Sequence, residues 1–252
     1  MRRLLPGPAA EVSPAEAYAD VPVATGRPGV RVNMVASLDG AITVEGRSGG
    51  LGGDADWRVF MALRALADVI LVGAGTVRNE GYGPPRLDDE VQAARRERGQ
   101  ARLPRIAVVT RSLTLDWDSR FFAEAPDDAR PLVLTCAAAP EDGRRRAAEV
   151  AELVVAGDDD VDVGEALARL GGQGVASVLC EGGPYLNRAL AADGLLDELC
   201  LTVSPLLVGG AGPRMLAGAA PSPGGVPMAL HAAYEDEGFL FLRHRAGAAE
   251  RV

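Results

Sequence analysis

The chain has 252 residues, of which 48% are hydrophobic and 24% charged, the composition of an ordinary globular protein. Its formal charge of −9 at pH 7 produces an overall field that repels nucleic acids and anionic membranes, so neither is an expected partner. No apolar run of transmembrane length occurs, and Pro6 interrupts the short apolar start of the chain, which predicts a cytoplasmic protein. Three cysteines without CxxC spacing and two histidines offer no basis for a metal site.

The first part of the chain is expected to form an arm, a strand and a helix. Five prolines within residues 1–29 predict an irregular N-terminal arm. The apolar stretch 30–37 predicts a buried strand. Residues 54–67 place Val59 and Leu63 on one face and predict an amphipathic helix.

Strands and helices are expected to alternate through the middle of the chain. The apolar run 69–72 predicts a short buried strand, and the charged stretch 84–100 predicts a surface loop with some helix. Further strands are expected at 106–110, 132–135, 153–155, 175–180 and 198–203, and helices at 141–149, 163–170 and 185–192.

The C-terminal part of the sequence predicts antiparallel pairing of two strands. Residues 228–245 form two strand patterns with a break near 235–238, which is typical of an antiparallel hairpin. Together with the alternation before it, this predicts an α/β fold with a mostly parallel central sheet and an antiparallel C-terminal hairpin. Because no linker divides the hydrophobic pattern, we expect one domain over 30–245, followed by a short tail, 246–252.

A glycine turn, Glu181-Gly182-Gly183-Pro184, lies between a predicted buried strand and a predicted helix. Two glycines let the backbone approach a ligand closely, and the free amides at a helix start favour phosphate. A tight turn that binds nothing is the alternative. Glu181 favours a ligand site, because α/β sheets place ligand contacts at the carboxyl ends of their strands.

A second glycine turn, Gly73-Ala74-Gly75-Thr76, also follows a predicted buried strand. It lacks the third glycine of a GxGxxG motif and the acidic residue about 20 positions later, so the pattern does not favour a dinucleotide fold of the Rossmann type. Its amides and the Thr76 hydroxyl remain candidates for phosphate contacts.

Other polar residues give weaker indications. Asp39 follows the first strand and is a candidate for proton transfer, although Asp-Gly also favours a simple turn. Arg64 and Arg86 would matter only if they converge on an anion. No GxSxG, Walker, HExxH or paired-carboxylate pattern occurs, so hydrolase and kinase functions have no residues to support them.

Three segments together resemble one family. They are NMVASLDG at 33–40, VILVGAGTVRNE at 69–80, and VLCEGGPYLNRAL at 178–190 continuing into LLDEL at 195–199. In order and spacing they resemble the reductase domain of the bifunctional riboflavin-biosynthesis deaminase/reductase, a member of the dihydrofolate-reductase-like superfamily. The resemblance covers about residues 30 to 245 and implies a three-layer dihydrofolate-reductase-like fold, NADPH as cofactor and a homodimer.

The resemblance also implies a reaction and a set of contacts. The reaction reduces 5-amino-6-(5-phosphoribosylamino)uracil to its ribitylamino product by hydride transfer to the ribose C1′. The implied cofactor contacts are Val35, Thr76, Glu80, Ser112, Gly182, Gly183, Pro184, Tyr185, Leu186 and Asn187. The implied substrate contacts are Ser48, Arg64, Arg86 and Glu181, with Arg64 expected at the substrate phosphate.

Departures from the family pattern keep other functions open. Where the family often has Asp-Asp-Pro, this chain has Glu80-Gly81-Tyr82, and Gly50 stands where a tryptophan is common. No zinc deaminase signature occurs. A free-standing pyrimidine reductase is therefore the first expectation, a dihydrofolate reductase or other pterin reductase is the first alternative, and a non-catalytic nucleotide-binding protein is the second.

Overall fold

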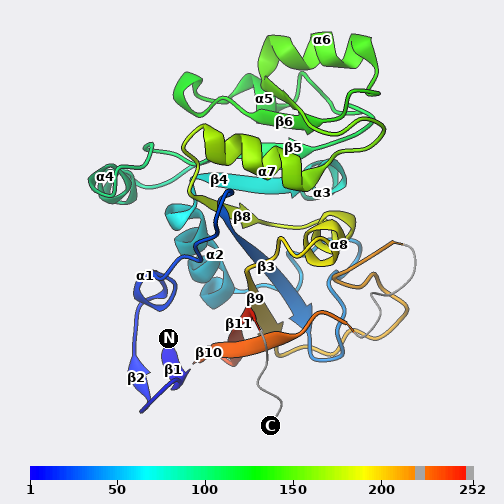
Figure 1. Cartoon of the computed structure of the whole chain (residues 1–252). Coiled ribbons are helices and arrows are strands. Elements are labelled where there is room, and N and C mark those ends of the chain that lie inside the picture. Colours follow the sequence, from blue (N-terminus) through cyan, green and yellow to red (C-terminus); the bar gives the residue numbers. More distant parts are fainter. Residues whose placement is uncertain (219–224, 248–252) are drawn as a thin grey trace.

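Eleven strands form one continuous sheet within residues 1–218 and 225–247, the part of the chain that the computed structural model describes (Figure 1). The strands are β1 (Arg2–Leu5), β2 (Ala10–Glu11), β3 (Gly29–Ser37), β4 (Val69–Gly73), β5 (Arg105–Val109), β6 (Leu132–Thr135), β7 (Glu152–Val155), β8 (Ser177–Cys180), β9 (Glu198–Ser204), β10 (Met228–Asp236) and β11 (Phe239–Ala246). The helices are α1 (Pro14–Ala17), α2 (Asp54–Leu66), α3 (Ala74–Glu80), α4 (Asp89–Glu97), α5 (Arg120–Ala123), α6 (Glu141–Val150), α7 (Val163–Gly172) and α8 (Pro184–Ala192).

The sheet has a parallel part and an antiparallel part. Its strand order is β2-β1-β10-β11-β9-β3-β8-β4-β5-β6-β7. All pairs from β9 to β7 are parallel, whereas β9, β11, β10, β1 and β2 pair antiparallel. The predicted α/β fold, with a mostly parallel sheet and an antiparallel C-terminal hairpin, is confirmed.

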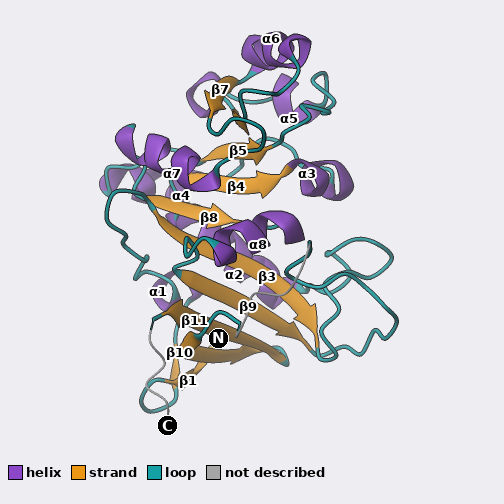
Figure 2. Ribbon diagram, turned by 45° about the vertical axis from the view of Figure 1, so that its right-hand side comes forward, coloured by secondary structure: helices purple, strands orange, loops and turns teal. Residues whose placement is uncertain are grey.

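Helices cover both faces of the sheet and produce three layers (Figure 2). On one face, α7 and α8 pack Leu167, Leu170 and Leu190 against strand residues such as Val32 and Leu71. On the other face, α2 packs its apolar stripe over β8, β9 and the C-terminal hairpin, and α3 and α5 cover the parallel strands. Each central strand is therefore buried on both sides, which explains its continuous apolar sequence.

The N-terminal arm is irregular only in part, because it contains two short strands and a short helix that the prediction lacks. Strand β1 pairs with β10, and β2 pairs with β1. Helix α1 begins with a capping box in which Ser13 and Glu16 each satisfy a backbone amide of the other. The sequence pattern missed these elements because they are very short and β1 pairs with a strand more than 200 residues away. Of the expected tail, residues 248–252 lie outside the described residues.

The charged stretch between β4 and β5 contains the expected helical segment, α4. Arg95 on α4 is fully buried and donates hydrogen bonds to the carbonyl oxygens of Ala65 and Ala67 at 2.9 and 2.7 Å. These carbonyls end helix α2 and lack partners within it, so Arg95 fixes the end of α2.

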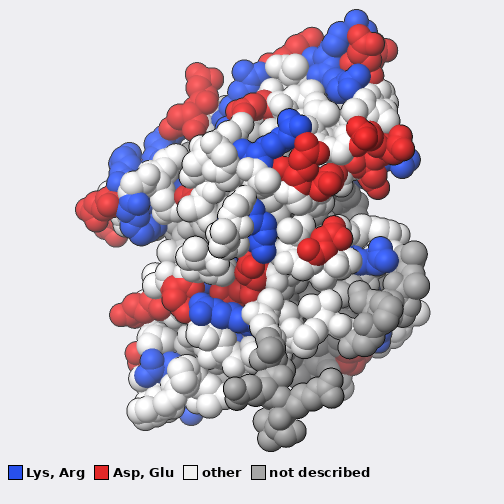
Figure 3. Space-filling model, viewed as in Figure 1, with Lys and Arg blue, Asp and Glu red and all other residues white. Residues whose placement is uncertain are grey.

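Charged side chains are distributed over the surface. Acidic and arginine side chains both occur over the face seen in Figure 3, in small groups of each sign. No helix in the described parts of the chain is long and apolar enough to cross a membrane.

Candidate functional site

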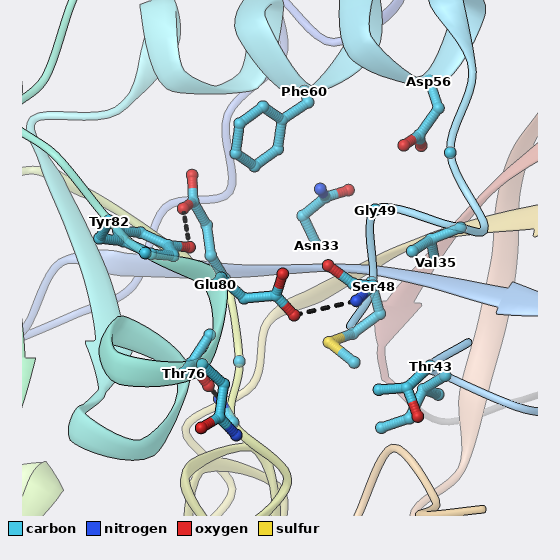
Figure 4. A pocket seen from close by; sticks show the side chains of 18 of the residues that line it. Asn33, Val35, Thr43, Ser48, Gly49, Asp56, Phe60, Thr76, Glu80 and Tyr82 are labelled. Carbon is cyan, nitrogen blue, oxygen red and sulfur yellow. Dashed lines mark hydrogen bonds between the residues drawn. The ribbon is translucent and has the colours of Figure 1, made fainter. Parts of the chain in front are cut away.

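A cleft of about 900 Å³ opens at the carboxyl ends of β3, β4 and β8 (Figure 4). Helix α2 forms one wall, and the loop 42–53 and the segment from Thr76 to Pro84 form others. The turn 181–184 closes the end of β8. Ligands of open α/β sheets bind at this edge, so both the volume and the location are those of a small-molecule site.

The two glycine turns meet in this cleft. The amide of Gly73 donates to the carbonyl oxygen of Gly182 at 2.9 Å, and the amide of Gly183 donates to Thr76 Oγ1 at 3.1 Å. Gly182 has a φ of +90°, which favours glycine, and a Cβ added to Gly183 would lie 3.0 Å from Thr76 Oγ1. The residues of the turn 73–76 are the start of helix α3 and not a separate loop.

An ion pair joins helix α2 to the end of β8. Arg64 Nε donates to Glu181 Oε1 at 2.6 Å, and Arg64 Nη2 donates to Oε2 at 2.7 Å. The Tyr82 hydroxyl donates to the same Oε2 at 2.6 Å. The guanidinium of Arg64 also lies over the rings of Phe60 and Tyr82, at 4.2 and 5.6 Å from their centroids. Both carboxylate oxygens of Glu181 therefore have fixed donors.

Burial and charge act together on these groups. Burial raises the pKa of Tyr82 well above 10.0, and the adjacent Glu181 carboxylate raises it further. Burial opposes the charge on Arg64, but the attraction of Glu181 outweighs it and raises the pKa of the guanidinium. Arg64 is therefore charged and Tyr82 protonated at neutral pH.

A second polar contact fixes the loop that covers the cleft. The carboxylate of Glu80, at the end of α3, accepts a hydrogen bond from the amide of Ser48 at 2.9 Å (Figure 4). This bond ties the loop 42–53 to α3. Two positions that the resemblance assigns to different ligands, cofactor for Glu80 and substrate for Ser48, are thus direct neighbours.

The cleft also contains polar residues that the sequence analysis did not single out. Asp56 lies in the first turn of α2 and Asn33 lies on β3, and both line the cleft (Figure 4). Burial raises the pKa of Asp56, an effect that its hydrogen bond with Thr202 partly offsets. Asn33 lies in the segment that carries the family resemblance, so this signal was available.

The structure divides the predicted site residues into two groups. Those that line the cleft are Val35, Ser48, Arg64, Thr76, Glu80, Glu181, Gly182, Gly183 and Pro184. Those that do not are Asp39, Arg86, Ser112, Tyr185, Leu186 and Asn187.

The second group has other contacts. The Arg86 side chain is 72% exposed and pairs with Glu124. Leu186 packs in the core, and buried Asn187 donates to the Met215 carbonyl oxygen. The predicted substrate contact of Arg86 and the predicted cofactor contact of Asn187 therefore have no geometric support.

Asp39 anchors a loop outside the cleft. Its carboxylate accepts hydrogen bonds from the Ser37 hydroxyl at 2.5 Å and from the amides of Val208 and Gly209 at 3.1 and 2.6 Å. These bonds lower the pKa of Asp39 to about 2. The geometry supports the turn-forming interpretation of Asp39 and gives no support to the predicted catalytic role.

The residues at the glycine turns fit a dinucleotide. Side chains at Gly182 and Gly183 would meet Met34 Sδ at 3.3 Å and Thr76 Oγ1 at 3.0 Å, so glycine lets the turn pack closely against β3 and α3 at the edge of the cleft. Helix α8 starts directly behind it, and the first amides of a helix have no acceptors within the helix. These features suit a pyrophosphate, with a nicotinamide reaching into the cleft.

The fold and this cleft define an α/β protein with a small-molecule site at the carboxyl ends of its parallel strands. The chain belongs to the RibD C-terminal domain family, whose model matches residues 28–233. This match confirms the resemblance seen in the three sequence segments. The family comprises pyrimidine reductases of riboflavin biosynthesis with the dihydrofolate-reductase-like fold.

Individual relatives agree with this assignment. The chain is 35% identical over 188 residues to the 2,5-diamino-6-ribosylamino-4(3H)-pyrimidinone 5′-phosphate reductase of Archaeoglobus fulgidus, covering 73% of this chain and 83% of the relative. The reductase of the same name from Methanothermobacter thermautotrophicus is 32% identical over 191 residues, covering 75% and 83%. A pyrimidine reductase-like protein of Corynebacterium diphtheriae has a similar structure, with a TM-score of 0.83, 26% identity and coverage of 94% and 99%.

Proposed function

We propose that this chain is an NADPH-dependent reductase that converts the ribosylamino group of a phosphorylated pyrimidine into a ribitylamino group. The proposal is supported by membership of the RibD C-terminal domain family and by the names of the archaeal relatives. The observation that carries it is the meeting of the two glycine turns beside the Arg64–Glu181 pair, because a cofactor and a polar substrate would there share one cleft.

Hydride transfer to C1′ requires little from the protein side chains except the alignment of cofactor and substrate. The opened ribosylamine is an imine with an electrophilic C1′, so a bound nicotinamide would supply the hydride to this carbon while the imine nitrogen takes up a proton. The chain must hold the two reactants together and exclude water. No protein nucleophile is needed for this step.

Specific residues divide these tasks. The turn 181–184 and Thr76 hold the cofactor pyrophosphate. Glu181, fixed by Arg64 and Tyr82, accepts hydrogen bonds from sugar hydroxyls. Ser48 and Glu80 close the loop 42–53 over the ligands. Hydrogen bonds to a buried, fixed carboxylate are worth more than those formed in water, so Glu181 positions the sugar with C1′ toward the cofactor.

The direct test is NADPH oxidation by the purified chain. The assay compares the phosphoribosylaminopyrimidine with dihydrofolate, and each with NADH in place of NADPH. We expect turnover of the pyrimidine with NADPH. No turnover of either substrate, together with no change in the fluorescence of micromolar NADPH, would contradict every enzymatic function.

Dihydrofolate reduction is the second candidate function. The observation that favours it is Tyr82, which occupies the position of the common Asp-Asp-Pro segment and contributes an aromatic ring to the cleft wall. Turnover of dihydrofolate in the absence of pyrimidine turnover would assign this function. NADPH binding without turnover of either substrate would instead assign the non-catalytic alternative.

A homodimer is also proposed, and it rests on the family resemblance. Light scattering at micromolar concentration tests it. A monomer under conditions in which the chain is active would refute it.

A further inference from the structure

Asp56 occupies the end of the cleft that the roles above leave unassigned. It projects from the first turn of α2 and lies apart from Thr76, as Figure 4 shows. Gly52 makes room beside it, because a Cβ at Gly52 would lie 2.9 Å from Asp56 Oδ2. Within residues 1–218 and 225–247, no arginine forms an ion pair with Asp56. The carboxylate therefore enters the cleft with its charge uncompensated.

Two polar residues lie near Asp56. Thr202, which is buried on β9, is its hydrogen-bond partner, and Asn33 lies across the cleft on β3. Asn33 Oδ1 is buried and has no hydrogen-bond partner in the described part of the chain. Buried polar atoms rarely stay unpaired, so polar atoms of a ligand are expected at this end.

The position along α2 indicates which part of a substrate meets Asp56. Asp56 and Arg64 are eight residues apart, which is about 12 Å along the helix axis. Arg64 and Glu181 stand at the sugar end in the proposed function, on which this inference rests. The heterocycle then lies toward Asp56, with the edge farthest from its C6 substituent facing the carboxylate. That edge carries N3 and the substituents at C2 and C4.

Two substrate forms differ at this edge. In a 2-amino-4-oxopyrimidine, the 2-amino group and N3–H are adjacent donors. In a uracil, a carbonyl oxygen replaces the amino group, leaving N3–H between two acceptors. A carboxylate has only acceptors, so it pairs with the first edge through two parallel hydrogen bonds and repels the carbonyl oxygens of the second.

We propose that Asp56 is the specificity-determining residue of the cleft and selects a 2-amino-4-oxopyrimidine edge over a uracil edge. The expected substrate is therefore the diamino compound, before deamination, and not the uracil compound that the sequence analysis expected. A deaminase then acts after this enzyme and not before it. Pterins carry the same 2-amino-4-oxo edge, so the experiment includes one.

The test compares three substrates and three proteins. The substrates are 2,5-diamino-6-ribosylamino-4(3H)-pyrimidinone 5′-phosphate, 5-amino-6-(5-phosphoribosylamino)uracil and dihydrofolate. The proteins are the unaltered chain, Asp56→Asn and the control Asp54→Asn, which changes an exposed acid in the same helical turn outside the cleft. Turnover gives kcat/KM, and the fluorescence of Trp57 at the cleft gives binding without cofactor.

The unaltered chain should prefer the diamino compound to the uracil by on the order of 100-fold in kcat/KM, because the wrong edge leaves the partly buried Asp56 carboxylate facing a carbonyl oxygen. Asp56→Asn should lower activity on the diamino compound and raise it on the uracil, since a carboxamide can donate to the C2 carbonyl and accept from N3–H. Asp54→Asn should leave the ratio unchanged. A gain on the uracil cannot arise from misfolding.

The outcomes separate this inference from the proposed function. Three outcomes would overturn the role of Asp56 while leaving the reductase function intact. The unaltered chain could reduce both pyrimidines at equal rates, it could prefer the uracil, or Asp56→Asn could lose the same activity on both. If only dihydrofolate is reduced and Asp56→Asn abolishes its binding, the selection of a 2-amino-4-oxo edge stands and the riboflavin-pathway function fails.

Discussion

Arg64 and Glu181 form a two-bond ion pair, at 2.6 and 2.7 Å, between the last turn of helix α2 and the carboxyl end of β8. Their side chains are 15% and 3% exposed, so the pair is shielded from water. The family resemblance assigns both residues to the substrate. Because the two side chains pair, Arg64 fixes the position of the Glu181 carboxylate and Glu181 fixes the position of the Arg64 guanidinium.

The ion pair predicts a large effect of Arg64→Ala on stability. The variant leaves the buried Glu181 carboxylate without its partner, which should lower the free energy of unfolding by about 3–5 kcal/mol. Arg64→Lys keeps the charge but cannot form both parallel bonds, so its loss should be smaller. Urea denaturation measures both. Unchanged stability of Arg64→Ala, with a raised KM for the phosphorylated substrate alone, would instead support the expected phosphate contact.

Tyr82→Phe should reduce activity by more than its loss of stability accounts for. The variant keeps the ring beside Arg64 and removes the 2.6 Å hydrogen bond to Glu181, a bond to a charged group worth about 1.5–3 kcal/mol. We expect kcat/KM to fall by about tenfold because Glu181 loses one of its fixed donors. The matched control is Tyr234→Phe, which loses a buried hydrogen bond to Ala17 outside the cleft lining. Equal activity losses in both variants would refute the positioning role.

Gly183→Ala should weaken NADPH binding. Its Cβ would lie 3.0 Å from Thr76 Oγ1, so the hydroxyl must move and the Gly183 amide loses its acceptor. We expect the Kd measured by NADPH fluorescence to rise by at least about tenfold, equivalent to 1.4 kcal/mol. Gly172→Ala is the control, because a Cβ there meets nothing within 4 Å. A folded Gly183→Ala protein with unaltered affinity would exclude this turn from the cofactor site.

Asp39 should supply stability that depends on pH. Its pKa is lowered from 3.8 to about 2 by the Ser37 hydroxyl and by the amides of Val208 and Gly209. The stabilisation is therefore complete above the unfolded pKa and is lost as the pH falls toward 2. Asp39→Asn should lower the Tm at pH 7 and approach the unaltered chain near pH 2. A catalytic Asp39 would instead show lower turnover at an unchanged Tm.

Asp56 should have the opposite effect on stability. Burial raises its pKa above 3.8, so the folded protein binds this proton more tightly than the unfolded chain does. Ionised Asp56 therefore destabilises the fold increasingly as the pH rises through its raised pKa. Among the cleft residues, Arg64 is positive, and Glu80 and Glu181 are negative. Asp56→Asn should raise the Tm at pH 7, with a difference that shrinks toward pH 4. A lower Tm at pH 7 would contradict this prediction.

Several features of the protein could be predicted from local sequence. Strand β4 and helix α2 appear where their apolar patterns predict them, because burial on two faces or on one face leaves a direct trace in residue order. The two glycine turns can also be recognised in the sequence, because a position such as Gly182 needs a backbone conformation that few other residues adopt. The order of the three family segments then identified the fold and the family.

Other features depend on contacts between distant segments. The short strands β1 and β2 form because β10 offers an open edge, which no local pattern in the arm reveals. The local sequence indicates Asp39 as a candidate for proton transfer and does not distinguish Asp56 from other acidic residues. Asp56 lines the cleft because helix α2 packs over the sheet. The carboxylate of Asp39 instead accepts hydrogen bonds from the amides of Val208 and Gly209.

The sequence by itself therefore determined the α/β fold, the family and the two glycine turns, because periodicity and glycine placement act over short stretches of chain. The tertiary structure decided which of the candidate polar residues share a site. Arg64 meets Glu181 across 117 positions, and Arg86 pairs with Glu124 at the surface instead of reaching the cleft. Electrostatic interactions fall off with distance in space, so their partners are set by how the sheet and helices pack and not by the order of residues along the chain.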